Sequence, residues 1–455
     1  MSAFDISARE ISRRNIFKLL GVSAVAGAGL TACAPGGSSS SKSLGAAPSA
    51  STAKGEATLW FNDDDVLKVF KTLVPSFNQK YPQVKMNLVG VDVSTKLAPT
   101  LISGTGVPDG SFAADGMPAA HADQLYDLTT LMKPHTADTV QYKLDVNTVG
   151  AKLVGIPWDT DPGLFFYRED ILSAAGVDPT QLTSYDALLD AARAVKGKNG
   201  NARPIPLEQD PDLGMQWLMM LVNQQQGSGL TDAAGNLTID TDAYRTALTW
   251  IKTVVDEGLG ARCKFASTAQ IAMADNGTVS IVPWAIWFNF LVQTSLTKSS
   301  GHWRVQQLPA WASGGARSGV MGGSSFVIPA KAAQPDLAWL FYEHALYSTE
   351  GIKQDFGPNT VYPNGLNTAL PSVKSALEGE ALFNKLPQLG GTSLWDVAAK
   401  ASLDIPPGYH IPTWFDQAAN YLGSNLQLLM DGKMSVDDVI SKSVSGIKTN
   451  LVNRP

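Results

Sequence analysis

The chain has 455 residues, enough for two or three domain-sized units, and 44% of them are hydrophobic while 17% are charged. This composition excludes a polytopic membrane protein and a largely disordered chain. The formal net charge of −6 offers no basic surface for nucleic acid, and two cysteines are too few for a disulfide framework.

The first 32 residues have the pattern of an export signal. Basic residues are concentrated in Ser12–Lys18, which resembles a twin-arginine export motif. A run without any charged residue follows from Leu19 to Ser41, and it is too rich in Gly, Ala and Ser for a good membrane-spanning helix. We therefore predict that residues 1–32 form a signal peptide.

The end of this uncharged run predicts a membrane anchor. Leu30–Cys33 resembles a bacterial lipobox, in which the thiol of Cys33 would receive a lipid. Residues 33–55 are rich in Ser, Gly and Ala and predict a flexible linker. The folded part is then expected outside the cytoplasm, tethered to the outer face of the cell membrane.

After the linker, short strands and helices alternate. Ala57–Phe61 and Val84–Leu88 are β-prone, and a helical apolar stripe from Val66 to Phe77 lies between them, with Pro75 expected to kink or shorten this helix. Gly110–Ala114 is a third strand candidate. Strand, helix and strand in succession predict a parallel sheet in an α/β fold.

The rest of the chain continues this alternation. A capping-box start at Ser184 predicts a helix through Val195, and Gly258 suits the end of the helix that carries the apolar stripe Tyr244–Val255. Further candidates are a strand at Val279–Trp284 and two helices at Ala338–Tyr347 and Trp414–Met430. No repeat of 20–50 residues is present, which argues against solenoids and propellers.

Catalytic and cofactor motifs are missing from the sequence. It has no P-loop, no H-E-x-x-H, no G-x-S-x-G and no C-x-x-C, so we predict neither a cofactor nor a metal site and expect no enzyme. The five histidines show no helical pairing, and Cys263 is interpreted as a small buried hydrophobe. Because carboxylates are numerous, a glycosidase pair stays open.

Tryptophans near Pro, Gly and Asp are more informative. Ile156–Asp159 and Val282–Trp287 place Trp158, Trp284 and Trp287 at expected strand ends. A flat indole ring can cover the C–H face of a sugar while a carboxylate accepts its hydroxyl hydrogens, which predicts carbohydrate binding. The alternative for each of these rings is an ordinary place in the core.

Several blocks of the sequence resemble one family. Lys152–Trp158, Leu164–Leu172 and Ala174–Val177 resemble the extracellular solute-binding proteins of carbohydrate ABC importers, the group that includes maltose-binding protein. Phe77–Pro82 upstream and Met321–Ser324 downstream are similar to family segments in the expected order. The resemblance extends from about residue 56 to the C-terminus.

The resemblance implies a two-lobed α/β fold in which each lobe is a mixed sheet flanked by helices. Hinge crossings are expected near Pro162–Tyr167, Gly322–Ile328 and Tyr362–Leu370, and the ligand would bind between the lobes as the hinge closes. The implied boundaries are residues 56–163 and 323–370 for lobe 1, and residues 164–322 and 371–455 for lobe 2.

The resemblance also implies where ligand would be touched. The expected ligand-binding residues come from strand-end loops, the glycine turn and second-lobe aromatics: Asn62, Asp63, Asp64, Asp115, Trp158, Asp159, Trp284, Trp287, Gly323, Ser324, Trp395, Tyr409 and Trp414. For Asp63 and Asp64 the alternative is a capped helix N-terminus. For Gly323 the alternative is a hinge bend that needs positive φ.

The expected function is capture of a mono- or oligosaccharide by a monomer that delivers it to the membrane subunits of an ABC importer. One alternative is a binder with the same fold for a phosphorylated polyol, a polyamine or a metal chelate. Another is an exported glycan hydrolase.

Overall fold

The computed structural model describes residues 42–62 and 64–453. The predicted signal peptide, the twin-arginine motif and Cys33 lie outside the described residues. Within the described part, no helix combines the length and the apolar character needed to cross a membrane.

The folded part begins earlier than the predicted linker boundary at residue 55. Ser43 forms a β-bridge with Asp127, and the Leu44 amide donates to the Asp127 carbonyl at 3.3 Å. Leu44 and Ala53 are buried. Since each of these residues buries an apolar side chain against the body, residues 42–54 belong to the folded unit rather than to a tether.

One five-stranded sheet organises the part that we call lobe 1. Its strand order is β2 (Val84–Gly90), β1 (Gly55–Phe61), β3 (Gly110–Ala114), β13 (Ser324–Val327) and β6 (Ile156–Pro157). β1 is parallel to β2 and β3, whereas β13 is antiparallel to β3 and β6. The predicted parallel strand–helix–strand start is confirmed.

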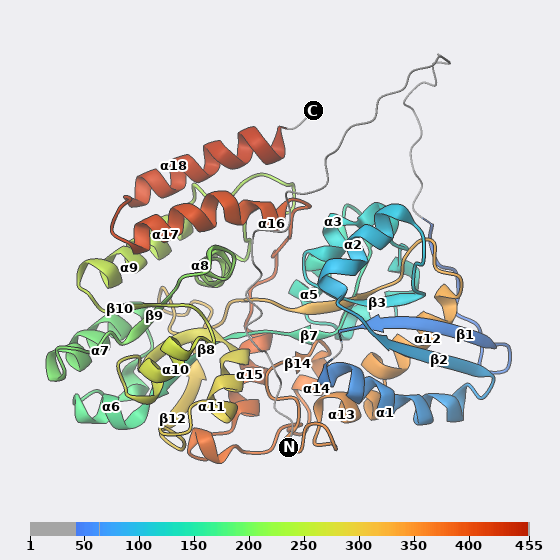
Figure 1. The fold of residues 1–455 in the computed structure, drawn as a ribbon, viewed down its shortest axis with the longest axis horizontal. Coiled ribbons are helices and arrows are strands. Elements are labelled where there is room, and N and C mark those ends of the chain that lie inside the picture. The colour runs from blue at the N-terminus through green and yellow to red at the C-terminus, as the bar shows by residue number, and fades with distance from the viewer. Residues whose placement is uncertain (1–41, 63, 454–455) are drawn as a thin grey trace, which may run out of the picture. The chain divides into compact units, whose positions relative to one another are not determined.

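Helices cover both faces of this sheet (Figure 1). The helices of lobe 1 are α1 (Asp65–Lys80), α2 (Val93–Ser103), α3 (Met117–Ala120), α4 (Thr129–Met132), α5 (Gln141–Val146), α12 (Pro335–Tyr347) and α13 (Thr349–Phe356). A short hairpin of β4 (Thr148–Val149) and β5 (Lys152–Leu153) follows α5. Leu59 and Phe61 belong to the larger core cluster, while Trp60 between them packs against the cluster that contains α2 residues. This alternation is what a strand covered on both faces requires.

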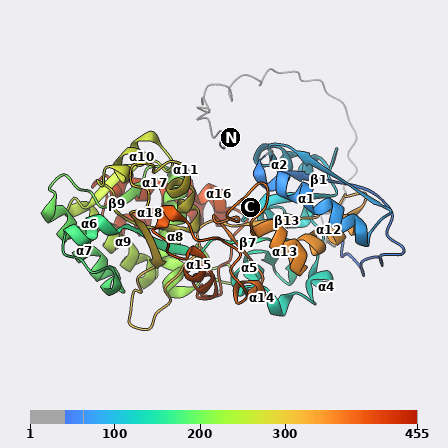
Figure 2. The ribbon, with the colours of Figure 1, turned by 90° about the horizontal axis from the view of Figure 1, so that it is seen from below.

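Helix α1 differs from the prediction because it runs through Pro75 to Lys80. Pro75 lies on the exposed side of the helix, where water can satisfy the Lys71 carbonyl that the missing amide leaves without a partner. The buried stripe of α1 packs with α12 and α13 (Figure 2). Core packing therefore outweighs the local cost of the proline.

A second set of strands organises lobe 2. β8 (Gly163–Arg168) lies between β11 (Ile281–Ala285) and β12 (Trp303–Gln307), antiparallel to both. β9 (Ile205–Glu208) and β10 (Gly260–Cys263) form a parallel pair next to β11, since the Ile281 amide donates to the Pro204 carbonyl at 2.9 Å.

The helices of lobe 2 flank these strands, and α17 and α18 pack with α8 and α9 (Figure 1). They are α6 (Glu169–Ala174), α7 (Tyr185–Lys198), α8 (Pro211–Gln226), α9 (Asp242–Asp256), α10 (Thr268–Asp275), α11 (Asn289–Thr294), α15 (Leu394–Leu403), α16 (Phe415–Ala418), α17 (Ser424–Met430) and α18 (Val436–Ile447). The predicted caps are confirmed: Ser184 accepts from the Ala187 amide at 3.1 Å, and Gly258 has φ +59°. The predicted helix at Trp414–Met430 is α16 and α17 joined by a π-helical turn at Ala419–Gly423.

Three segments connect the lobes side by side. β7 (Asp159–Thr160) leads into β8, and β14 (Leu370–Pro371) pairs antiparallel with β7. Pro162 and Val320 form a bridge just before β13. After β14, α14 (Lys374–Leu377) leads back toward α15. These segments fall at or next to the three expected hinge crossings, and the lobe boundaries themselves stay predictions.

Candidate functional site

A buried lysine holds the hinge segments together. Lys143 lies on α5 with its side chain fully buried, and its Nζ donates to both carboxylate oxygens of Asp115 at 2.8 and 2.7 Å and to the Ser324 carbonyl at 3.0 Å. The Asp159 carboxylate lies 3.9 Å from the same nitrogen. Because Asp115 follows β3, Asp159 begins β7 and Ser324 begins β13, one ammonium group joins three segments.

The glycine turn before β13 is shaped by this cluster. Gly323 has φ +125°, and a Cβ there would overlap the Asp115 carboxylate and come within 3.0 Å of Lys143 Nζ. The amide of Ser324 donates to Asp159 Oδ1 at 2.6 Å. Both the backbone conformation and the close approach of the ion pair therefore require glycine at position 323.

The cluster contains more carboxylates than cations. Burial raises the pKa of Asp159 to about 7, although Lys143 opposes the shift. Burial, and next the charge of Asp159, raise the pKa of Asp161 well above its usual range. The Asp161 amide donates to the Tyr142 hydroxyl at 3.2 Å, but Oδ1 of its buried carboxylate has no hydrogen-bond partner among the described residues. A buried polar atom without a partner is costly, and such atoms mark candidate ligand contacts.

An indole ring from lobe 2 lies beside this carboxylate. A Cβ placed on Gly322, whose φ is +91°, would lie 3.0 Å from Asp161 Oδ2 and 3.5 Å from Trp287 Nε1. Trp287 is half-buried, and its Nε1 donates to the Met321 carbonyl at 3.2 Å. We call Asp161, Trp287 and the intervening Gly322 the hinge site.

Phe265 supports the indole from the loop after β10. Its ring meets Trp287 edge-on at 4.6 Å and stacks on Trp284 at 5.7 Å with an interplanar angle of 4°. The Phe265 amide donates to the buried Glu208 carboxylate at 2.9 Å. The next residue, Ala266, has φ +57°, the left-handed region that costs a non-glycine residue energy. The strained backbone thus lies directly beside the ring that orients Trp287.

We expect Ala266→Gly to raise the free energy of unfolding by about 0.5–1 kcal/mol, because relief of the left-handed strain exceeds the entropy that glycine adds to the unfolded chain. Denaturant unfolding of the two proteins measures the difference. Ala272→Gly is the matched control: it lies exposed on α10, where the same change should lower stability by about 0.5–1 kcal/mol. Equal losses at both positions would contradict the assignment of strain.

Two of the predicted residues in the β1–α1 loop, Asn62 and Asp64, accept hydrogen bonds from backbone amides. Asn62 Oδ1 accepts from the Val93 amide at 3.3 Å. Asp64 caps α1 by accepting from the amides of Val66 at 3.0 Å and Leu67 at 3.4 Å, as the alternative interpretation expected. Asp63 lies outside the described residues. These contacts leave a role in ligand binding as a prediction.

Three of the predicted tryptophans are in the core. Trp158 is 5% exposed, and its Nε1 donates to Asp355 Oδ2 at 2.6 Å. Trp284 is 1% exposed, and Trp395 is 3% exposed and packs edge-on against Phe383 at 5.0 Å. Alanine at these positions would leave large cavities, so loss of folding there would not report ligand binding.

The two remaining aromatic candidates lie near the C-terminal helices. Tyr409 is buried against Gly229, and Trp414 is half-buried at the N-cap of α16. Of all predicted residues, the structure therefore brings together Asp115, Asp159, Gly323 and Ser324 around Lys143, with Trp287 close by on the other side of Gly322.

Sequence reasoning missed Lys143, Tyr142 and Asp161. The sequence could have indicated Asp161, because it lies two residues after the predicted Asp159. Residues two apart in a strand have their side chains on the same face. No pattern distinguished Lys143 from the other lysines. Its role depends on α5 packing against β3 and β13, which are distant from it in sequence.

The buried carboxylates predict that stability falls as pH rises. Burial raises the pKa of Asp355 from 3.8 to about 8 despite the hydrogen bond from Trp158, and that of Asp159 to about 7. Between about pH 4 and 8 the folded protein thus keeps protons that the unfolded chain has released, so the free energy of unfolding decreases with pH. Melting curves from pH 5 to 8.5 should show this decrease, with a smaller slope in Asp355→Asn. Parallel slopes in the two proteins would refute the role of Asp355.

The cluster is not arranged as a metal site. In residues 42–62 and 64–453 no group of three or more His, Cys, Asp or Glu side chains is placed to hold a metal ion. Cys263 is free and buried, and burial raises the pKa of its thiol to about 12. Its role as a small buried hydrophobe agrees with this environment.

Comparisons with known proteins give the family. The family described as bacterial extracellular solute-binding protein matches residues 63–351, more than half of the chain. The arabinooligosaccharide-binding protein of Bacillus subtilis (strain 168) is 27% identical over 66% of this chain and 71% of its own length. The lactose-binding protein of Rhizobium radiobacter is 26% identical over 77% of this chain and 83% of its own length.

A solved structure supports the fold. The sugar-binding protein MalE from Xanthomonas citri matches with a TM-score of 0.72 and 19% identity, covering 88% of this chain and 98% of that one. The expected two-lobed α/β fold class is confirmed, as is the resemblance stated from the sequence. The relatives are binding proteins, and the family places the chain outside the cytoplasm. By its match over residues 63–351, this chain belongs to the bacterial extracellular solute-binding protein family.

Proposed function

We propose that this protein captures a mono- or oligosaccharide between its lobes and delivers it, unchanged, to an ABC importer. The observation that carries the proposal is the hinge site: a buried carboxylate oxygen of Asp161 without a partner, beside the half-buried indole of Trp287. The names of the arabinooligosaccharide-binding and lactose-binding relatives support a sugar as the ligand.

The chemistry of the hinge site suits a sugar. A ligand hydroxyl can donate to Asp161 Oδ1, a charge-assisted bond when the carboxylate is ionised. A sugar C–H face can pack on the indole of Trp287, which its bond to the Met321 carbonyl holds in place. Trp287 would thus contact the apolar C–H face of the sugar, and Asp161 would accept a hydrogen bond from its hydroxyl rim.

Closure would then connect capture to transport. Asp161 belongs to the hinge segment and Trp287 to lobe 2, so a ligand touching both favours the closed arrangement and shifts its population. The membrane subunits of the importer would recognise that arrangement. We further propose that the protein is a monomer anchored to the outer face of the cell membrane by a lipid on Cys33.

The arginines do not favour an anionic ligand. Arg168 is paired with Asp170 at 2.7 Å, and Arg193 with Glu257 at 2.7 Å. Lys143, the cation of the neighbouring cluster, is already bound to Asp115 at 2.7 Å. A phosphorylated polyol would lack a free positive partner there.

A ligand screen on residues 42–455 tests the function. Arabino-oligosaccharides, lactose and maltose are compared with a phosphorylated polyol, a polyamine and a metal chelate by thermal shift and calorimetry. We expect one or more saccharides to raise the melting temperature with increasing concentration. Stabilisation by only a non-sugar solute would favour the alternative binder, and cleaved glycan after long incubation would favour a hydrolase.

A further inference from the structure

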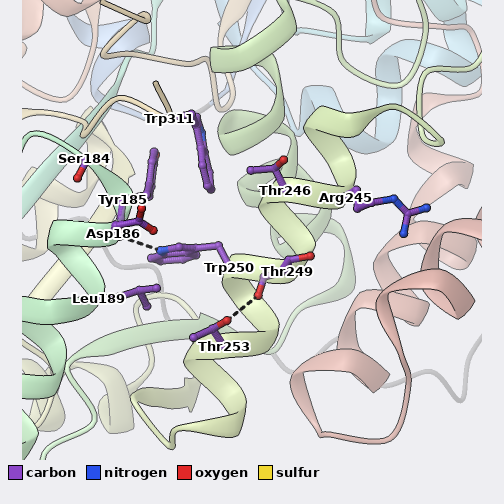
Figure 3. Close-up of a pocket in the computed structure, with 10 residues that line it drawn as sticks. All are labelled: Ser184, Tyr185, Asp186, Leu189, Arg245, Thr246, Thr249, Trp250, Thr253 and Trp311. Atoms are coloured by element: carbon purple, nitrogen blue, oxygen red, sulfur yellow. Dashed lines mark hydrogen bonds between the residues drawn. The ribbon is translucent and has the colours of Figure 1, made fainter. Parts of the chain in front are cut away.

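A pocket lies in lobe 2 among residues that do not belong to the hinge site. It opens between the start of α7 and the middle of α9, and its volume is about 380 Å³, within the range of roughly 300–1,000 Å³ typical of small-ligand pockets (Figure 3). Trp311, on the segment after β12, forms one of its walls. We call it the Trp311 pocket, and it shares no residue with the hinge site.

The aromatic wall of this pocket is rigid. Trp311 stacks on Tyr185 with ring centroids 3.8 Å apart and an interplanar angle of 18°. Trp250 meets Tyr185 edge-on at 5.5 Å, and its Nε1 donates to the Tyr185 carbonyl at 3.2 Å. Tyr185 in turn donates its hydroxyl to Gln224 at 2.9 Å. Tyr185 and Trp250 are buried while Trp311 is only half-buried, so Trp311 presents ring surface that is already oriented.

The opposite wall carries hydroxyl groups. Thr246 and Thr249 are exposed on α9 and line the pocket together with Trp311 (Figure 3). Among the described residues, neither threonine hydroxyl has a hydrogen-bond partner, whereas the nearby Thr253 hydroxyl donates to the Thr249 carbonyl at 3.0 Å. The exposed Asp186, in the first turn of α7, adds a carboxylate to the lining.

The charges of the pocket favour a neutral ligand. Arg245 is the one basic residue in the lining, and its guanidinium is paired with Asp437 on α18. Figure 3 shows its side chain directed away from the aromatic wall. An anionic ligand would therefore face Asp186 without a free cation. A ligand with one apolar face and a rim of hydroxyls fits both walls.

We propose that the Trp311 pocket is a second saccharide-binding site. One sugar ring stacks on the exposed indole face, its hydroxyls exchange hydrogen bonds with Thr246 and Thr249, and Asp186 accepts a further hydroxyl hydrogen. A glycan held there would be kept on the surface of the protein in addition to the molecule at the hinge. This site does not depend on the hinge site for any contact.

Titration of lactose and arabinotriose up to about 20 mM tests the proposal, with calorimetry and saturation-transfer NMR as readouts. The wild-type chain should show a weak binding event besides the tight one. Trp311→Ala should abolish the weak event. The double variant Thr246→Val, Thr249→Val, which keeps the aromatic wall, should weaken it about tenfold, as expected from two lost hydrogen bonds.

Two further variants make the result decisive. Thr253→Val is the matched control and should leave the weak event unchanged, because its hydroxyl is already bonded within α9. Asp161→Asn, a change in the hinge site, should weaken the tight binding event and leave the weak event unchanged. A failure of the proposed function at the hinge site is therefore distinguishable from a failure of the proposed second site at the Trp311 pocket. The proposal is overturned if no weak event occurs, or if it persists unchanged in both pocket variants.

Discussion

Lys143→Met is expected to lower the free energy of unfolding by about 3–5 kcal/mol. Its ammonium is fully buried and lies 2.7 Å from Asp115, 3.0 Å from the Ser324 carbonyl and 3.9 Å from Asp159. Methionine fills the space but supplies no charge, so two buried carboxylates lose their shared cation.

Equilibrium unfolding in guanidinium chloride measures this loss. Lys85→Met is the matched control, since Lys85 makes an ion pair of similar length with Glu56, at 2.9 Å, but its side chain is 73% exposed. An exposed pair contributes only about 0–1 kcal/mol. If Lys143→Met is no more destabilising than Lys85→Met, the buried cluster does not hold the hinge segments together.

Asp161→Asn is expected to weaken saccharide binding about 10- to 100-fold while leaving the protein as stable as before or more stable. The loss corresponds to a charge-assisted hydrogen bond from a ligand hydroxyl. The neutral amide is tolerated because burial and Asp159 already raise the pKa of Asp161, so the folded protein disfavours its charge. Affinity and stability should therefore change in opposite directions.

The protonation of Asp161 gives this prediction a second readout. Donation from a sugar hydroxyl favours the ionised carboxylate, so ligand binding lowers its raised pKa and releases a proton. Affinity should then increase with pH, and calorimetry in two buffers of different ionisation enthalpy should detect the released proton in the wild type. Asp161→Asn should release none. Unchanged affinity and equal proton release in both proteins would remove Asp161 from the proposed site.

Local patterns in the sequence predicted much of the fold. The strand at Gly110–Ala114 has the bounds of the strand candidate, and Ser184 and Gly258 cap the expected helices. These features depend on residues close together in the chain, where backbone hydrogen bonding and period decide the outcome. Pro75 shows the limit, because long-range packing of α1 on α12 and α13 overrode a local signal.

The site was predicted less completely. Asp115, Asp159, Gly323 and Ser324 were chosen as strand-end and turn residues, and they do meet around one lysine. Trp158, Trp284 and Trp287 were chosen as candidate platforms from their Pro, Gly and Asp neighbours, yet Trp158 and Trp284 are buried among other aromatic rings while Trp287 is only half-buried. Periodicity gives the face of an element, but exposure depends on what packs against that face.

The sequence by itself determined the class of the protein: an α/β chain, a series of family-like blocks in order, and turn glycines where the backbone needs positive φ. Only the tertiary structure decided which charges are desolvated. Lys143 and Asp161 become unusual because segments far apart in sequence enclose them, and the energy of a charge depends on the water and partners that surround it rather than on its neighbours along the chain.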